Sequence, residues 1–290
     1  MPRPPVRSDR RVAIATSRDF PDLTTDDRHL LPALSALGIR GVPAVWDAPG
    51  IRWEDFDAVL IRSTWSYYLD RPAFLKWIRR VDDRSTLWNP ATVIRWNCHK
   101  SYLLDLEKHG VPIIPTALLG GPDEIVPTLE KRSWDRAVVK PAVSAGAYQT
   151  HLLHREKVRS ELRRMRGLEG VGQLLLQPYV PEVERAGERS IVFIDQRYSH
   201  AFLRAPKLGE NPALKEGSAY RPQPGELAVA RRAIRCSPAP TLYARVDLVP
   251  DGDGPPRVME VEMIEPALWL GNSPSGLRRF ARGIRDRLRR

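Results

Sequence analysis

Four charged side chains alternate with apolar residues in two segments near the end of the chain. Arg245 and Asp247 lie in LYARVDLVP, and Glu260 and Glu262 lie in PRVMEVEMI. Side chains two apart in a strand share a face, so a hairpin symmetric about the intervening DGDGP turn would place Asp247 opposite Glu260 and Arg245 opposite Glu262. Clustered carboxylates repel unless cations neutralise them, and magnesium favours carboxylate and phosphate oxygens. The alternative is a solvated strand face with one Arg–Glu pair across the strands.

Two lysines are candidates for phosphate binding. Lys100 begins a predicted helix, and Lys140 ends the apolar run VVK and precedes AVSAGA. The small residues of that loop let backbone N–H groups approach phosphate oxygens closely. Neither a GxxxxGK[ST] loop nor a GxGxxG after a strand is present, which argues against the common nucleotide-binding folds. Taken singly, each lysine is more typical of an exposed surface position.

A third signal is the buried segment LLLQPYV, followed by Glu188. The end of such a strand can offer backbone groups to an adenine edge, and the carboxylate can bind ribose hydroxyls. On its own, this segment is more typical of a core strand that enters a turn.

The order of these features is more informative than any one of them. Lys100, VVKPAVSAGA, LLLQPYV, Glu188, Arg204, RVD and MEVE follow one another as they do in the ATP-grasp superfamily, which the chain resembles over nearly its whole length. In that family two lysines hold the α- and β-phosphates, a hinge strand binds adenine, and an acidic set holds two magnesium ions. The thirteen positions from Asp247 to Glu260 resemble the family's spacing, although Glu262 stands where many members have Asn.

The resemblance implies a function and a role for each matching residue. It implies an ATP- and Mg²⁺-dependent ligase that activates a carboxylate as an acyl phosphate and joins it to a nitrogen nucleophile, with Mn²⁺ as a possible substitute for magnesium. The implied nucleotide-binding residues are Lys100, Lys140, Ser144, Ala145, Gly146, Gln177, Tyr179, Val180 and Glu188. The implied catalytic cations are Arg204 and Arg245, and the implied magnesium ligands are Asp247, Glu260 and Glu262.

Three longer segments resemble one group within the superfamily. RSTWSYYLDRPAFLKW, WNPATVIRWNCHKSYL and MEVEMIEPALWL are similar to the group that includes the cyclo-ligase of cycloserine biosynthesis, which closes O-ureido-D-serine. Glutathione-synthetase-like and ribosomal-protein-modifying ligases are more distant. Two stretches depart from the group, since Ser66 stands in TWSY where TWDY is expected and 209–212 replace a GDFR-like stretch. Both places would face the substrate, so the resemblance does not identify the substrate. It does imply a role in antibiotic biosynthesis.

The first part of the chain predicts parallel strands joined by helices. RVAIATS, VPAVW and DAVLIRS read as short buried strands, with a helix from about Thr24 to Leu37 that ends at Gly38. This βαβ beginning predicts a small open α/β domain through about residue 95. The overall expectation is an α/β protein, α+β as a whole, with the ATP-grasp fold.

Four residues end the third of these strands, where an open α/β domain presents a ligand. They are the predicted substrate-binding residues Arg62, Ser63, Thr64 and Trp65. The alternative is ordinary loop residues with Trp65 in the core. The partner of Arg62 could then be internal, for example Asp47 or Asp70.

The remaining elements predict three domains. A helix over 98–110, strands at 136–142 and 148–154, a helix over 155–165 and a strand over 172–180 come first. Two hairpins and a terminal helix follow, with the polar, Gly- and Pro-rich loop 206–224 expected to close over the acyl phosphate. We expect a substrate-binding domain over 1–95, a lid and central subdomain over 96–180, and a subdomain with the metal site over 181–290.

The formal charge of +11 raises nucleic acid as an alternative partner. The excess arginines lie at the two ends, without a recognisable nucleic-acid-binding motif. In the last helix an apolar stripe at helical spacing makes the arginines its solvated face; the stripe consists of Leu277, Phe280, Ala281, Ile284 and Leu288. We therefore expect small-molecule substrates and no nucleic acid, with a nucleotide-binding protein that has lost ligase activity as a second alternative.

The rest of the composition indicates the cellular compartment and the roles of the cysteines. No run approaches the roughly 18 apolar residues of a membrane-spanning helix, and the first residues lack the apolar centre of a secretory signal, so a cytoplasmic protein is expected. The two cysteines, Cys98 and Cys236, fit neither a zinc site nor a disulfide framework. We expect a monomer or homodimer.

Overall fold

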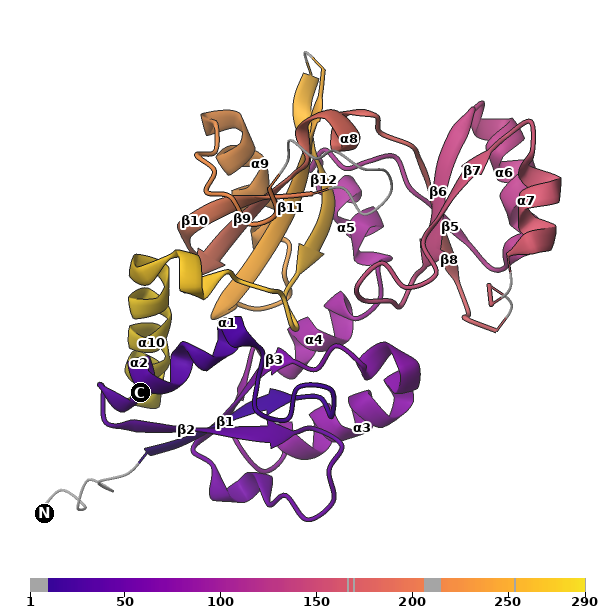
Figure 1. The fold of residues 1–290 in the computed structure, drawn as a ribbon. Coiled ribbons are helices and arrows are strands. Elements are labelled where there is room, and N and C mark those ends of the chain that lie inside the picture. The colour runs from indigo at the N-terminus through magenta and orange to yellow at the C-terminus, as the bar shows by residue number, and fades with distance from the viewer. Residues whose placement is uncertain (1–9, 166, 169, 206–214, 253, 290) are drawn as a thin grey trace, which may run out of the picture.

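Three four-stranded sheets follow one another along the chain in the computed structural model, which describes residues 10–165, 167–168, 170–205, 215–252 and 254–289. Figure 1 shows the N-terminal sheet at the bottom, the C-terminal sheet above it, and the middle sheet projecting to one side. The chain therefore folds as three consecutive layered units.

The N-terminal sheet is parallel, with strand order β2-β1-β3-β4. Its strands are β1 (Arg10–Thr16), β2 (Ile39–Val45), β3 (Ala58–Ser63) and β4 (Leu87–Trp88). The first three were predicted, and their parallel pairing confirms the α/β assignment. The helix expected over 24–37 is instead two short helices, α1 (Thr25–Arg28) and α2 (Leu30–Ser35), divided at His29.

Two helices of this unit were not predicted from the sequence. They are α3 (Arg71–Asp82), capped by the Asp70 side chain, and α4 (Ala91–Asn97). The helix expected over 98–110 begins only at Tyr102, as α5 (Tyr102–Lys108). Lys100 lies in the turn before it, because its N–H bonds to the carbonyl of Ala142, 2.8 Å away, and not to a helical carbonyl.

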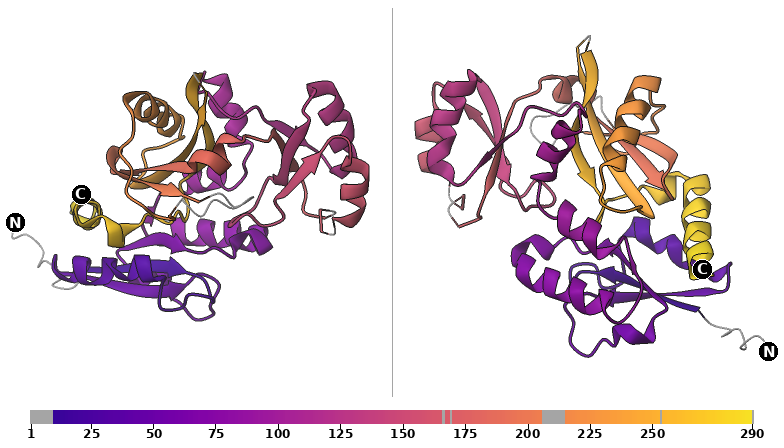
Figure 2. Two further views of the ribbon diagram at one scale, coloured as in Figure 1. Left: turned by 45° about the horizontal axis from the view of Figure 1, so that its top comes forward. Right: turned by 180° about the vertical axis from the view of Figure 1, so that it is seen from behind.

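The middle sheet is antiparallel, with strand order β5-β8-β6-β7. Its strands are β5 (Ala117–Leu119), β6 (Arg136–Pro141), β7 (His151–His154) and β8 (Leu174–Pro178). The helices α6 (Ile125–Arg132) and α7 (Val158–Arg164) cover one face of this sheet, as both views in Figure 2 show. Their apolar side chains, including Leu129 and Val158, pack with strand residues in one core cluster.

The C-terminal sheet has the order β10-β9-β11-β12 and is antiparallel throughout. It consists of β9 (Glu188–Ile194), β10 (Arg197–Arg204), β11 (Tyr243–Asp251) and β12 (Gly254–Glu262), which confirms both predicted hairpins. The short helix α8 (Glu182–Ala186) precedes it, and α9 (Pro224–Arg235), which was not predicted, packs on it. Helix α5 joins the same core cluster, although the expected division groups α5 with the middle unit.

The last helix, α10 (Pro274–Leu288), connects the first and last sheets. Its predicted stripe is confirmed, because Phe280, Ala281 and Ile284 are buried in a cluster shared with α2, β1 and β9. Figure 1 shows α10 beside α2, with the C-terminus near the N-terminal sheet. Arg278 and Arg282 lie on the exposed side. Packing of α10 against both sheets fixes the position of the N-terminal unit relative to the C-terminal one.

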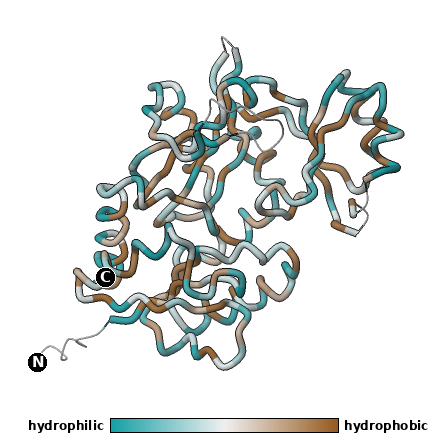
Figure 3. The backbone as a smooth tube through the Cα atoms, in the orientation of Figure 1, coloured by the Kyte–Doolittle hydropathy of each residue, from teal (hydrophilic) through white to brown (hydrophobic). Residues whose placement is uncertain are grey.

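Hydrophobic residues follow the strands in the interior of each unit, and hydrophilic residues lie on the outer helical turns and loops (Figure 3). Within the described ranges, no helix has both the length and the apolar content needed to cross a membrane. Four 3-10 turns complete the described elements: η1 (Trp53–Asp55), η2 (Tyr67–Asp70), η3 (Pro122–Glu124) and η4 (Leu270–Asn272).

Candidate active site

The four charged residues of the last hairpin have the register predicted from their alternation. Arg245 pairs with Glu262 and Asp247 pairs with Glu260 between β11 and β12, and a register shift follows immediately after Asp247. The four side chains therefore lie on one face of the ribbon, since residues two apart share a face.

This face borders a cavity of about 1090 Å³ between the three units. Its walls include every residue predicted to bind nucleotide, together with Arg204, Arg245, Glu260 and Glu262. The tertiary structure thus brings together residues from Lys100 to Glu262 that are far apart in sequence. Asp247 has no exposed surface and lies beneath the cavity wall.

Two arginines hold the Asp247 carboxylate. The Arg245 Nε and Nη2 atoms donate to its two oxygens at 2.9 Å each, and Arg204 Nη1 donates to Oδ2 at 3.2 Å. Ser190 Oγ donates to Oδ1 at 2.6 Å. Arg245 also pairs with Glu262. Burial acts to lower the pKa of Arg245, but the charges of Asp247 and Glu262 outweigh it and raise that pKa, so this arginine stays charged.

The two lysines differ in their contacts. The Lys100 ammonium pairs with Glu260 and donates to the carbonyl of Ser144 at 3.1 Å. Burial acts to raise the pKa of Glu260, but Lys100 and Lys140 outweigh it and lower that pKa to about 2. Lys140 lines the same cavity, and within the described ranges its ammonium forms no hydrogen bond or ion pair, while burial lowers its pKa. Lys140 therefore has donors available for an anionic ligand.

Other carboxyl groups of the cavity lack enough positive charge. Burial raises the pKa of Glu188 to about 7, although Arg204 Nη1 lies 3.3 Å from its Oε2 atom and acts in the opposite direction. Burial also raises the pKa of Glu262, with Arg245 opposing the shift and Glu260 adding to it. Each of these acids would be stabilised in its charged form by an additional cation.

The carboxylates fit a magnesium site in chemistry. Oxygen ligands on one face, beside a lysine that is predicted to bind phosphate, suit Mg²⁺. Across the part of the chain that the structure describes, no three Asp, Glu, His or Cys side chains are already grouped to hold a metal ion. The reason is that Lys100, Arg204 and Arg245 engage the carboxylates that the sequence points to.

The predicted adenine-binding residues lie at the end of β8. The buried Gln177 donates through Nε2 to Thr116 Oγ1 at 2.9 Å, which fixes the orientation of its amide. Tyr179 lies under the guanidinium of Arg136, with Cζ 4.1 Å from the ring centroid. Glu188 is the first residue of β9 and faces Arg204 across the β9–β10 hairpin. These contacts order one end of the cavity.

Arg62, which was predicted to bind substrate, does not line the cavity. Arg62 is 1% exposed, its Nε donates to Asp27 Oδ1 at 2.8 Å, and its Nη2 donates to the Pro266 carbonyl at 2.7 Å. The internal alternative is the observed one, with Asp27 as the partner in place of Asp47 or Asp70. An arginine that ends a buried strand needs a counter-charge, and helix α1 supplies it.

The neighbours of Arg62 divide between the core and the cavity. Ser63 and Thr64, also predicted to contact substrate, are fully buried and do not line the cavity. Trp65 does line the cavity, and its indole N–H donates to the carbonyl of Glu265 at 2.9 Å. Ser66, which departs from the family pattern, lines it as well.

Several cavity residues were not predicted. Glu265, Asp26, Trp269 and Tyr148 all line the cavity. A signal for Glu265 was present in MEVEMIEP, where it is the third acidic residue, but it falls outside the alternation that identified the other two. The expected closing loop 206–224 is described only from residue 215 onward; 206–214, with the departure at 209–212, lie outside the described residues.

An aromatic contact joins two units at the cavity. The rings of Tyr68, from the N-terminal unit, and Tyr148, from the small-residue loop after β6, lie 4.8 Å apart between centroids. Gly146 and Ala147 in this loop have positive φ angles of 61° and 63°. This tight backbone turns the loop toward Tyr68.

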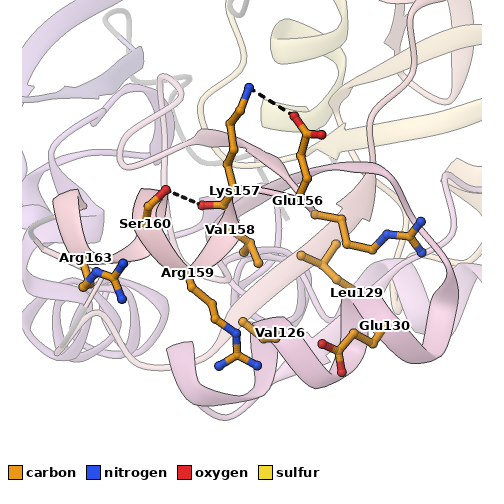
Figure 4. Close-up of a pocket in the computed structure, with 10 residues that line it drawn as sticks. Val126, Leu129, Glu130, Glu156, Lys157, Val158, Arg159, Ser160 and Arg163 are labelled. Atoms are coloured by element: carbon orange, nitrogen blue, oxygen red, sulfur yellow. Dashed lines mark hydrogen bonds and ion pairs between the residues drawn. The ribbon is translucent and has the colours of Figure 1, made fainter.

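A smaller cavity of about 290 Å³ lies on the outer side of the middle unit, between α6 and α7 (Figure 4). Apolar Val126, Leu129 and Val158 form part of it. At its edge Lys157 pairs with Glu156 at 3.1 Å, and Ser160 donates to the Lys157 carbonyl at 2.8 Å. No residue of this cavity belongs to the predicted site, and it reads as a gap between two packed helices.

Comparison with known proteins agrees with the fold. A family model for the N-terminal domain of D-cycloserine synthetase DcsG matches residues 12–89. The chain is 34% identical over 295 residues to the cycloserine biosynthesis protein DcsG of Streptomyces lavendulae, covering 96% of this chain and 99% of the relative.

Solved structures show the same relationship. The crystal structure of D-cycloserine synthetase DcsG superposes with a TM-score of 0.87 at 31% identity, covering 96% of this chain and 99% of that one. The ATP-grasp ligase PsnB, solved with a minimal precursor, Mg and ADP, has the same fold, with a TM-score of 0.64 at 14% identity over 96% of this chain and 98% of that one. The chain therefore belongs to the ATP-grasp ligases, in the family of the D-cycloserine synthetase DcsG.

Proposed function

We propose that this ATP-grasp ligase phosphorylates a substrate carboxylate and then joins the acyl carbon to a nitrogen of the same molecule, in the biosynthesis of an antibiotic related to cycloserine. The observation that carries the proposal is the pairing of Arg245 with Glu262 and of Asp247 with Glu260 on the wall of one cavity that Lys100 and Lys140 also line. The ring-containing product named for the relative supports an intramolecular reaction.

The proposed nucleotide site uses the predicted residues. Lys140, with no described partner, and Lys100 bind phosphate oxygens, and the loop Ser144–Gly146 covers them. Gln177, Tyr179 and Val180 line the adenine end, and Glu188 binds ribose. This orientation of the nucleotide is supported by the position of the lysines and arginines, which gather beside the β11–β12 ribbon at the proposed phosphate end.

The carboxylates of Asp247, Glu260 and Glu262 would bind one or two magnesium ions. These ions would neutralise charge on the transferring phosphate. Arg204 and Arg245 are placed to bind the same phosphate and the acyl oxygen, so that catalysis rests on placement and charge neutralisation. Both guanidinium groups already lie within hydrogen-bond distance of Asp247, which holds them in position.

The three units take separate roles in this proposal. Residues 1–95 supply the substrate end, 96–180 cover the nucleotide, and 181–290 carry the metal site. Segments from all three line the cavity, which supports a reaction at their junction. Helix α5 packs with the last unit, so the moving part of the lid would be the β5–β8 sheet with α6 and α7.

An ADP-release assay tests the proposed function. Purified protein with ATP and Mg²⁺ is offered O-ureido-D-serine, and D-serine is offered as the matched compound without the nucleophilic ureido nitrogen. We expect ADP release and a cyclic product with the first compound. If neither this compound nor a panel of other amino acids and ureido compounds raises ADP release above the background, the proposal is refuted.

The Lys140→Met variant should bind ADP about ten- to a hundredfold more weakly. A hydrogen bond to a charged group contributes roughly 1.5–3 kcal/mol, and methionine keeps the stem without the ammonium. Calorimetry measures the affinity directly. Lys157→Met, immediately before α7, is the matched control and should bind ADP as the wild type does. Unchanged ADP affinity in Lys140→Met would remove this lysine from the phosphate site.

The Tyr148→Ala variant should raise the KM for substrate about two- to tenfold. An aromatic pair contributes roughly 0.5–1.5 kcal/mol, and the Tyr68 ring is its partner at 4.8 Å. Tyr148→Phe keeps the ring and should behave as the wild type. Steady-state kinetics with each variant measures the KM for substrate. Equal KM values for the alanine variant and the wild type would show that the contact between Tyr68 and Tyr148 does not contribute to substrate binding.

A further inference from the structure

Glu265 is a buried acidic side chain of the cavity that forms no ion pair within the described residues. Glu265 follows β12, is 8% exposed and lines the cavity. Its carboxylate is hydrogen-bonded by its own backbone N–H, but by no other residue in the described part of the chain, and no ion pair reaches it there. Asp247 and Glu260, by contrast, are each held by an arginine or a lysine.

An unpaired carboxylate in this position is costly. Burial, and then the charge of Glu262, raise the pKa of Glu265 to about 8, even though Lys100 acts in the opposite direction. Lys100 itself is engaged by Glu260. A buried acid that the protein leaves without a partner is stabilised by a ligand that brings a hydrogen-bond donor or a positive charge.

The surroundings of Glu265 indicate which part of the substrate would bring this hydrogen-bond donor or positive charge. A carboxylate repels phosphate and acyl oxygens, and those groups have Lys100, Lys140 and the two arginines as partners. Glu265 instead lies on the side of the N-terminal unit, where the Trp65 indole donates to its backbone carbonyl at 2.9 Å. Phe20 packs edge-on against Trp65, with ring centroids 5.1 Å apart. The position of Glu265 is therefore fixed from the substrate side of the cavity.

We propose that Glu265 binds the nitrogen nucleophile and accepts its proton. This inference rests on the proposed function. As the nitrogen lone pair forms the C–N bond with the acyl carbon, the N–H bond breaks and its proton passes to a carboxylate oxygen of Glu265. Phosphate then leaves with the electron pair of its C–O bond. The proton acceptor and the phosphate-binding cations are thus different side chains of the cavity, which assigns the second chemical step to another residue than the first.

Hydroxylamine trapping tests this division. Hydroxylamine captures an acyl phosphate as a hydroxamate and, as a strong nucleophile that is uncharged near neutral pH, depends little on a base. With O-ureido-D-serine, ATP and Mg²⁺, Glu265→Gln should form cyclic product about a hundredfold or more slowly. In the presence of hydroxylamine the same variant should form hydroxamate within about fivefold of the wild-type rate. Glu265→Asp, which keeps the carboxylate, should recover part of the cyclisation.

The control is Glu107→Gln, at an exposed position on α5, which should match the wild type in both assays. Equal losses of cyclic product and hydroxamate in Glu265→Gln would overturn the inference, since the residue would then act in binding or phosphorylation. An unchanged rate of cyclisation would overturn it too. If the wild type forms neither cyclic product nor hydroxamate, the proposed function fails for this substrate, and the inference fails with it.

Discussion

The Glu260→Gln variant should lose ATP turnover by about a thousandfold or more. Glu260 lies opposite Asp247 at the cavity wall, and its charge is the one that Lys100 and Lys140 stabilise most strongly. Removing a metal-binding carboxylate costs several kcal/mol of transition-state stabilisation, and each ~1.36 kcal/mol is a factor of ten in rate. Substrate-dependent ADP release measures the effect, with Glu107→Gln as the control.

The same substitution should also lower the stability of the fold near neutral pH. An acid whose pKa falls from 4.5 in the unfolded chain to about 2 stabilises the native state above pH 4.5, and this contribution disappears as the pH falls toward 2. The glutamine variant should therefore be less stable than the wild type at pH 7 and approach it in acid. Removing one of several clustered carboxylates would by itself be expected to relieve repulsion and stabilise the fold. The opposite result is expected for Glu260, because its carboxylate pairs with Lys100.

Thermal melting at several pH values checks the stability, and kinetics at a temperature well below the transition checks the activity separately. Asp247→Asn should lose turnover by a similar factor, since Asp247 holds both arginines. Near wild-type turnover in both variants would refute the assignment of these carboxylates to metal binding.

The Arg62→Ala variant should be destabilised by about 3–5 kcal/mol, the usual cost of removing one partner of a buried ion pair. Arg62 and Asp27 are 1% and 2% exposed, so the substitution leaves the Asp27 carboxylate buried without its counter-charge. The guanidinium also lies over the Tyr243 ring, with Cζ 5.1 Å from the centroid, and that contact is lost. Denaturant unfolding measures the change in the free energy of unfolding.

Two controls separate a structural arginine from a substrate-binding one. Asp47→Ala removes the partner of the exposed Arg18 and should cost less than about 1 kcal/mol. The Arg62→Ala and Asp27→Ala effects should be less than additive in the double variant, because both remove the same pair. Unchanged stability together with a raised substrate KM in Arg62→Ala would show that this arginine binds substrate after all.

Much of the site was predictable because strand periodicity is local. The alternation of charged and apolar residues in LYARVDLVP and PRVMEVEMI, with a turn between them, predicts both the hairpin and its register. The order of Lys100, Lys140, Gln177 and Glu188 predicts a shared nucleotide site, and all four line one cavity. The helical stripe of α10 likewise predicts its buried face.

The elements and contacts that the sequence did not predict have a common physical origin. Helices α3, α4, α6, α8 and α9 were not predicted, and the helix expected over 24–37 is divided at His29, because most helical stability comes from tertiary packing and not from local preference. Arg62 was assigned to substrate because a strand end in an open sheet commonly presents a ligand. Its actual partner, Asp27, lies 35 residues earlier on another element, and nothing local to either residue indicates the pair.

The sequence alone therefore determined which side chains share a face of one strand or helix. Through the order of its motifs it also indicated the family, and it predicted residues that line one cavity. The tertiary structure alone decided which faces meet. It directed Arg204 and Arg245 onto the same carboxylate, buried Arg62 against Asp27, and left Glu265 at the cavity wall without an ion-pair partner among the described residues. The physical reason is that periodicity depends on backbone geometry within an element, whereas charge pairing and burial depend on elements that are distant in the chain.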